Sequence, residues 1–205
     1  MAEALATTAR SLAVGGMLVG PDRADGTSRW GYGDERIVGL AVVTETAADL
    51  AASTITLLQS GHRYSAMALV RQIIEAEYLI WLFAADAEQA RRWLNADDDE
   101  LWQIFRPSEI RKRSAGRFGA HEYRSHCGLG GHPSPKSRVF LPEHSMTVPV
   151  EWLWADLLTH LSRLWRTLVE AVSSVGFGAQ LPEGVVDSVG ETRAASNHGV
   201  GLSRA

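Results

Sequence analysis

Apolar residues recur with the 3.6-residue period of an α-helix along most of the chain, and no segment shows the alternation typical of a strand. Four long helices are predicted, over residues 2–18, 37–60, 64–84 and 149–172. Shorter helical patterns occupy 86–95, 97–105 and 120–129, and we expect Gly128, Gly130 and Gly131 to end the last of them. The pattern therefore predicts an all-α fold, a bundle of five to six helices.

The segment 64–84 is apolar around most of its circumference, which is typical of the central helix of a bundle. Arg71 and Glu75 lie one helical turn apart within it. We expect them to form a partly buried ion pair that fixes the packing register. The alternative is that they form the polar floor of a pocket.

Changes in composition divide the chain into three parts. Residues 1–36 hold an N-terminal helix and a glycine-rich loop with many turn residues. Residues 37–176 carry the strong helical patterns and form the predicted bundle. The pattern dissolves in 177–205, which we expect to be a disordered tail.

Composition limits the compartment and the partners of this 205-residue chain. Cys127 is the only cysteine, so no intrachain disulfide can form and a reducing compartment is expected. The N-terminus lacks the features of a secretory signal, and the 64–84 segment is interrupted by charged residues. These features predict a cytoplasmic protein without a membrane partner. The net charge of −4 argues against a uniformly basic nucleic-acid coat.

Three histidines and a cysteine crowd into residues 117–134, namely His121, His126, Cys127 and His132. They match no compact zinc motif, and His121 and His126 are spaced too far apart to share a helix face. The leading interpretation therefore includes no metal site and no cofactor. A metal-dependent enzyme built on the three histidines is the weaker alternative. Cys127 could serve as a nucleophile beside a histidine, although a single cysteine near a helix end is more commonly a packed residue.

The same region is strongly basic, because residues 106–138 hold eight Lys or Arg against two Glu. On an acidic protein this asymmetry favours contact with a phosphodiester backbone. The alternative is a solvated helix face that balances the acidic run 97–100. The residues predicted to contact RNA or phosphate are Arg111, Lys112, Arg113, Arg117, Tyr123 and His126.

Two signatures resemble those of a known group of proteins. Residues 65–77 read SAMALVRQIIEAE, with Leu-x-Arg followed four residues later by Glu, and PSEIRKR at 107–113 precedes Tyr123 and the His132-Pro-Ser segment. Both are similar to motifs of an uncharacterised bacterial all-helical family that distantly resembles the HEPN superfamily. Many HEPN proteins are dimeric ribonucleases of defence or toxin systems, and others bind RNA or nucleotides without cleaving them.

The HEPN resemblance implies a function and a site. In active members an arginine, a polar residue and a histidine act together, and Arg124, Ser125 and His132 are the matching residues here. Seven residues separate Arg124 from His132, one more than the family pattern has. The leading hypothesis is thus a HEPN-like module that binds RNA or a nucleotide, as a degenerate ribonuclease. If it is active, His132 would act on the 2′-hydroxyl or the leaving oxygen and Arg124 would stabilise the phosphate charge.

A different class of function is also consistent with the sequence. The predicted helix at 149–172 carries more apolar surface than one small bundle readily covers. The alternative hypothesis is therefore a non-enzymatic interaction protein that forms a homodimer.

Overall fold

A computed structural model of the chain describes residues 1–18, 28–141 and 148–177. Most of these residues are helical, and no strand occurs in the described ranges. The predicted all-α bundle is therefore confirmed. Most of the predicted glycine-rich loop and nearly all of the predicted tail fall outside these ranges.

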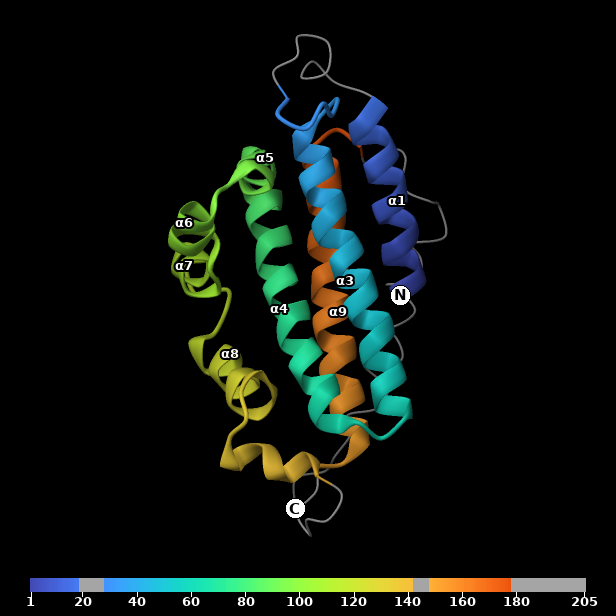
Figure 1. The fold of residues 1–205 in the computed structure, drawn as a ribbon, viewed down its shortest axis with the longest axis vertical. Helices are drawn as coiled ribbons and strands as arrows, with labels where there is room; N and C mark the ends of the chain where they lie inside the picture. Colours follow the sequence, from blue (N-terminus) through green and yellow to red (C-terminus); the bar gives the residue numbers. More distant parts are fainter. Residues whose placement is uncertain (19–27, 142–147, 178–205) are drawn as a thin grey trace, which may run out of the picture.

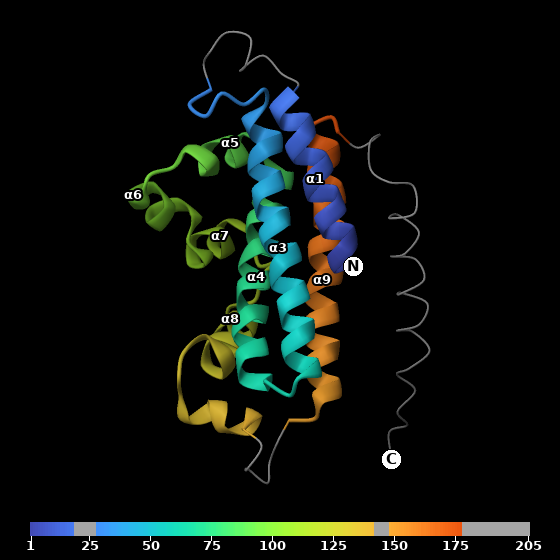
Figure 2. The same ribbon diagram turned by 45° about the vertical axis from the view of Figure 1, so that its right-hand side comes forward.

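Long helices run side by side and form the bundle (Figures 1 and 2). Helix α4 packs against both α3 and α9, and α1 packs on α3. Their bounds are α1 Ala2–Leu18, α3 Glu35–Gln59, α4 Arg63–Ala85 and α9 Val150–Ser174. Leu5 and Leu12 of α1 are completely buried, so this helix belongs to the same core as the predicted 37–176 bundle.

Short helical segments run along one side of the bundle, where α5 packs mainly on α3 and both α7 and α8 pack on α4 (Figure 1). They include two π-helical segments, one directly before α7 and one directly after α8. In chain order they are α5 Glu88–Asn95, α6 Asp98–Glu100, η1 Leu101–Phe105, α7 Pro107–Arg113, α8 Ala120–His126, η2 Cys127–Gly131 and the 3₁₀ helix η3 Pro135–Phe140.

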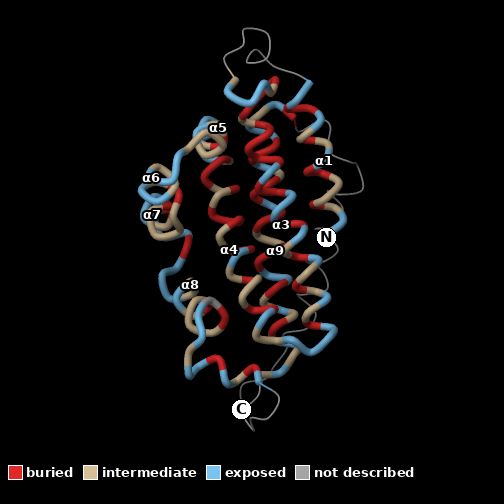
Figure 3. The backbone as a smooth tube through the Cα atoms, in the orientation of Figure 1, coloured by how far each residue is buried: buried red, intermediate tan, exposed pale blue. Residues whose placement is uncertain are grey.

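The core surrounds α4, as its pattern predicts. Buried residues of α3, α4 and α9 face one another in the middle of the molecule (Figure 3). Phe118, between α7 and α8, packs against two aromatic residues of α4. Its ring centroid lies 4.1 Å from that of Tyr78, and its ring is edge-on to that of Trp81. This aromatic contact holds the short helices against α4.

Several helix ends follow local signals. Gly61 has a φ of +79° just beyond α3, Pro107 begins α7, and Pro149 precedes α9. The glycines after His126 behave differently from the prediction, because they do not end the helix. The chain continues as the π-helical η2 to Gly131, where the small residues allow close contact with α4.

Among the described helices, α3 alone is long and apolar enough to cross a membrane by length and composition. In its most apolar window, 67% of the residues are buried inside the molecule.

Asp34 joins the first two long helices at their shared end. Its backbone N–H donates to the carbonyl of Gly16 in α1, at 2.7 Å. Its carboxylate caps α3 by accepting the Arg36 backbone N–H at 2.9 Å, and it also accepts the Arg36 guanidinium. Burial by itself would raise the pKa of Asp34, but the hydrogen bonds and charge of Arg36 outweigh it and hold this pKa below its ordinary value of 3.8.

The substitution Asp34→Asn keeps a capping side chain but removes the ion pair. We expect it to lower the free energy of unfolding by about 1 kcal/mol near neutral pH. Because the folded-state pKa of Asp34 is depressed, its contribution is complete above pH 3.8 and is lost as the pH falls through the folded value. Denaturant unfolding across this range should show the variant and the wild type converging at low pH. Asp49→Asn, on the exposed side of α3, is the control; an offset that persists in acid would contradict the assignment.

Gly130 is the point at which η2 touches α4 most closely. A Cβ atom at this position would lie 2.5 Å from the backbone carbonyl carbon of Met67 and 2.7 Å from the backbone nitrogen of Ala68. No side chain can relieve that contact, because both neighbours are backbone atoms.

We therefore expect Gly130→Ala to destabilise the fold by about 1–3 kcal/mol, as overpacking does. Gly128→Ala is the matched control in the same segment, since its Cβ would meet only the end of Lys136, at 3.7 Å. Thermal unfolding of the two variants compares them directly. Equal melting temperatures would show that η2 does not pack on α4 in this way.

Candidate functional site

The Arg124 and His132 side chains, predicted to act together, are both exposed, and no described hydrogen bond or ion pair joins them. Arg124 lies on α8 and donates from Nε to the carbonyl of Ala120, at 3.1 Å, within its own helix. His132 follows η2, and its φ of −144° and ψ of 145° are extended. The π-helical η2, Cys127–Gly131, lies between the two residues and supplies five of the seven positions that separate them.

The predicted RNA-contacting residues are divided between surface and interior. Lys112 pairs with Glu109 at 2.8 Å, and Arg113 is exposed. Arg117 is exposed, and its Nη2 donates to the Thr167 hydroxyl at 3.3 Å.

The others face α4. Arg111 lies over the ring of Tyr123, with its Cζ 4.9 Å from the ring centroid. The Tyr123 hydroxyl donates to Glu75 at 2.7 Å. Glu75 also accepts the Arg71 guanidinium at 2.8 Å, so the predicted structural ion pair is present. This network attaches α7 and α8 to the central helix.

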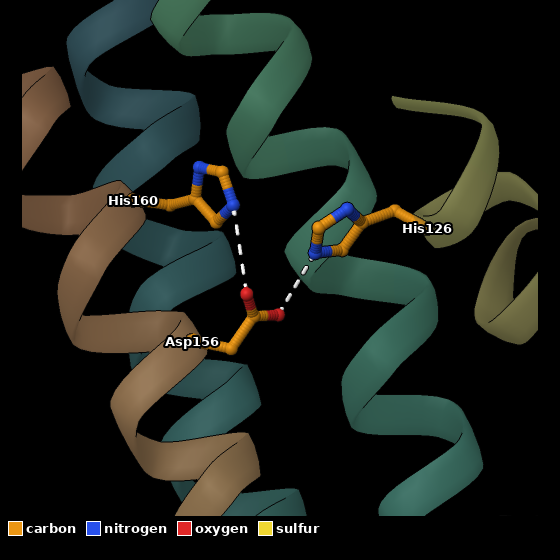
Figure 4. A group of neighbouring side chains, drawn as sticks. All are labelled: His126, Asp156 and His160. Carbon is orange, nitrogen blue, oxygen red and sulfur yellow. Dashed lines mark hydrogen bonds and ion pairs between the residues drawn. The ribbon is translucent and has the colours of Figure 1, made fainter. Parts of the chain in front are cut away.

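A different set of side chains converges between α8 and α9. Asp156 and His160 lie one turn apart on α9, and His126 reaches them from the end of α8 (Figure 4). We call these three residues the His–Asp–His triad. One potential ligand atom from each residue lies within 4.8 Å of the other two. In the described part of the chain, the triad is the one cluster of three or more His, Cys, Asp or Glu residues that could hold a metal ion.

Within the triad, the carboxylate of Asp156 lies between the two imidazoles. Its Oδ2 is 2.9 Å from His126 Nε2, and its Oδ1 is 3.7 Å from His160 Nε2. The two rings meet edge to face, with centroids 5.1 Å apart. Both Nε2 atoms therefore face the same carboxylate (Figure 4).

The opposite nitrogen of each ring is held by the protein. His126 Nδ1 is 2.9 Å from the backbone carbonyl of Glu122, so it carries the proton and donates to that oxygen. His160 Nδ1 is 3.1 Å from the carboxylate of Glu77, which is 3% exposed. Metal-binding histidines in proteins are held in this way, by a carbonyl or a carboxylate on the nitrogen that does not bind the ion.

Burial and charge have opposing effects on His126. Burial by itself would lower its pKa, but the hydrogen bond and charge of Asp156 outweigh this and raise the pKa above its ordinary value. A positive charge is thus favoured between His126 and Asp156. A proton supplies it when no metal is bound, and a metal ion that binds His126 Nε2 would have to displace this proton.

Glu122 and Arg163 border the triad on its more exposed side. Arg163 Nη1 lies 2.7 Å from Glu122 Oε1, which is in turn 3.9 Å from His160 Nε2. The Glu122 and Arg163 side chains are 35% and 38% exposed, whereas those of His160 and His126 are 2% and 9% exposed. The triad is therefore closed on the histidine side and open on the Glu122–Arg163 side.

Tyr78 contributes a buried hydroxyl to the same interior region. It has no hydrogen-bond partner among the described residues. Burial raises its pKa, Arg111 opposes this shift, and Glu122 and Glu77 add to it. The hydroxyl therefore stays protonated and remains an unused donor.

The metal ligands considered from the sequence, His121, His126 and His132, do not come together. His121 and His132 are exposed, and only His126 belongs to the triad. Five residues correspond to about 140° of rotation around a helix, so His121 and His126 project from different faces of α8. The partners of His126 in the triad are 30 and 34 positions away along the chain, so no local spacing relates them to it.

One signal in the sequence could have indicated part of the triad. Asp156 and His160 are four residues apart in a predicted helix, a spacing that places both on one face. Glu77, however, is 83 positions before His160, and no local pattern links the two.

A separate cavity of about 410 Å³ lies at the other end of the bundle, between α5 and the start of α3. It contains no triad residue and mixes acidic with basic groups. Its lining is Arg29, Glu35, Glu88, Gln89, Arg91, Arg92 and Asn95.

Comparison with known proteins assigns the chain to no family. No family model, no curated protein and no solved structure matches it.

Proposed function

We propose that this protein binds a divalent transition-metal ion at the His–Asp–His triad, and that its function depends on that ion. One observation carries the proposal. Both histidines direct Nε2 toward the Asp156 carboxylate, while their Nδ1 atoms are hydrogen-bonded to the Glu122 carbonyl and the Glu77 carboxylate. Such an arrangement fixes the tautomer and the ring orientation that a metal requires.

The donor set suggests the kind of metal. Two imidazoles and one carboxylate suit zinc and ferrous iron, whereas calcium and magnesium prefer oxygen ligands alone. Three protein ligands leave at least one coordination position for a small molecule, the usual arrangement of a catalytic rather than a structural site. The proposal thus takes up the metal-dependent enzyme considered from the sequence, with different ligands.

The distances support the proposal with small adjustments. Neighbouring ligand atoms around an ion lie about 3.0–3.4 Å apart at ordinary bond lengths. The two imidazole–carboxylate distances, 2.9 and 3.7 Å, bracket this range. Asp156 is 31% exposed, so its side chain can adjust and an ion can enter from solvent.

The RNA-binding function expected from the HEPN resemblance has weaker support. It rests on the basic segment, in which Arg113 and Arg117 are exposed. Arg124 is engaged by its own helix, and Lys112 by Glu109. Homodimerisation, the other alternative, is supported by two exposed apolar side chains of α9, Trp152 at 69% and Leu158 at 45%.

Metal binding is tested with untagged full-length protein and Zn²⁺, by calorimetry and elemental analysis. We expect one ion per chain. His160→Gln should weaken binding by more than the roughly 10–100-fold that loss of an outer partner costs, since it removes a direct ligand.

His121→Gln and His132→Gln are the matched controls, because both histidines are exposed and lie outside the triad. Their Zn²⁺ affinity should equal that of the wild type. Weaker binding in these variants, with His160→Gln unaffected, would place the metal at the cluster suggested by the sequence. No uptake by the wild type would refute the proposal.

The supporting role of Glu77 generates a separate prediction. Glu77→Gln keeps the size of the side chain but removes the charge that holds the His160 Nδ1–H group. We expect Zn²⁺ affinity to fall by about 10–100-fold while the stoichiometry stays at one. Glu75→Gln is the control, since Glu75 lies on the same helix but pairs with Arg71 and Tyr123 instead. Unchanged affinity in Glu77→Gln would show that the charge of Glu77 does not support metal binding by His160.

A further inference from the structure

The open side of the triad is bordered by a cation. Arg163 lies three residues after His160 and seven after Asp156 on α9, which places all three side chains along one face of the helix. Its guanidinium contacts Glu122 through Nη1 at 2.7 Å. A small molecule that reaches a metal in the triad from this open side would approach beside this arginine.

Arg163 is suited to recognise oxyanions. A guanidinium offers five N–H donors in a planar fork that matches two oxygens of a carboxylate or a phosphate. Burial by itself would lower the pKa of Arg163, but the hydrogen bond and charge of Glu122 raise it, and Glu77 and Asp156 add to this rise. The group is therefore a permanent cation.

Charge balance indicates what Glu122 does in this site. Asp156, Glu77 and Glu122 supply three negative charges, which a divalent ion and Arg163 neutralise together. Glu122 is not held tightly, because its ion pair with Arg163 is more than one-third exposed on both sides. If its carboxylate turns toward solvent, the metal-loaded site gains a net positive charge, which an external anion can neutralise.

A second cation lies further along the same edge. Arg117 is exposed, and its Nη2 lies 3.3 Å from the hydroxyl of Thr167, one turn beyond Arg163 on α9. When a metal is bound and Glu122 has turned toward solvent, these two cations would favour anions with more than one negative charge, such as a phosphate, over a simple carboxylate.

From these contacts we infer that the triad binds an oxyanion, the phosphate or carboxylate group of a small substrate, held between the metal and Arg163 in place of the Glu122 carboxylate. This inference rests on the proposed metal site. Glu122 is then an internal anion that occupies Arg163 until the substrate displaces it.

The test uses full-length protein loaded with Co²⁺, whose visible absorption reports a change in its ligands. Inorganic phosphate and acetate are titrated separately, and we expect both to change the spectrum saturably, phosphate at the lower concentration. Arg163→Gln should weaken phosphate binding by at least about tenfold, because it removes the charged fork.

Glu122→Gln provides the opposite test. It removes the competing negative charge, so phosphate should bind at least about threefold more tightly than to the wild type. General damage to the site would weaken binding in both variants, whereas the inference requires shifts of opposite sign. Arg166→Gln, an exposed arginine on the same helix, is the control and should match the wild type.

The two proposals fail in different ways. If the wild type takes up no Co²⁺, the metal site is refuted and this inference with it. If Co²⁺ binds but neither anion changes the spectrum, or the two variants do not shift in opposite directions, the metal site stands and the oxyanion inference is overturned.

Discussion

The buried carboxylate of Glu77 is the constraint on which the centre of this protein depends. It is 3% exposed, in the middle of a helix that otherwise supplies much of the apolar core. A buried charge without a partner is very costly, so another element must supply one. His160 does this from α9, through Nδ1 at 3.1 Å. The contact fixes the register of α9 against α4, because a shift by one turn would separate the two groups and leave the Glu77 carboxylate buried without His160.

A second polar network fixes the short helices in the same manner. Glu75, two residues before Glu77, pairs with Arg71 and accepts the hydroxyl of Tyr123. Because Tyr123 and His126 lie one turn apart on α8, the bond to Glu75 also orients the segment that carries His126. The close approach of Gly130 to the α4 backbone secures that segment at its other end. Two acidic residues of the central helix thereby determine where the imidazoles of two other elements meet.

The resulting site combines rigidity with access. Its histidines are buried and held from behind, whereas Asp156, Glu122 and Arg163 are each about one-third exposed. The interactions that satisfy buried polar groups in the fold would also orient the ligands of the proposed metal site, so one set of contacts would serve both. The open side, with one carboxylate and one guanidinium paired across it, is where a metal and a small anion would both enter.

The sequence by itself determined the fold class, the long helices, the central position of α4 and the Arg71–Glu75 pair. Each of these depends on residues within one or two turns of one another, which helical periodicity relates directly. Only the tertiary structure decided which faces meet. His126 is 30 positions from Asp156, and Glu77 is 83 positions from His160. Periodicity places each residue on a face of its own helix but does not identify the helix that packs against that face. The glycines after His126 show the same limit: their composition indicates a helix end, yet contact with α4 continues the helical turn.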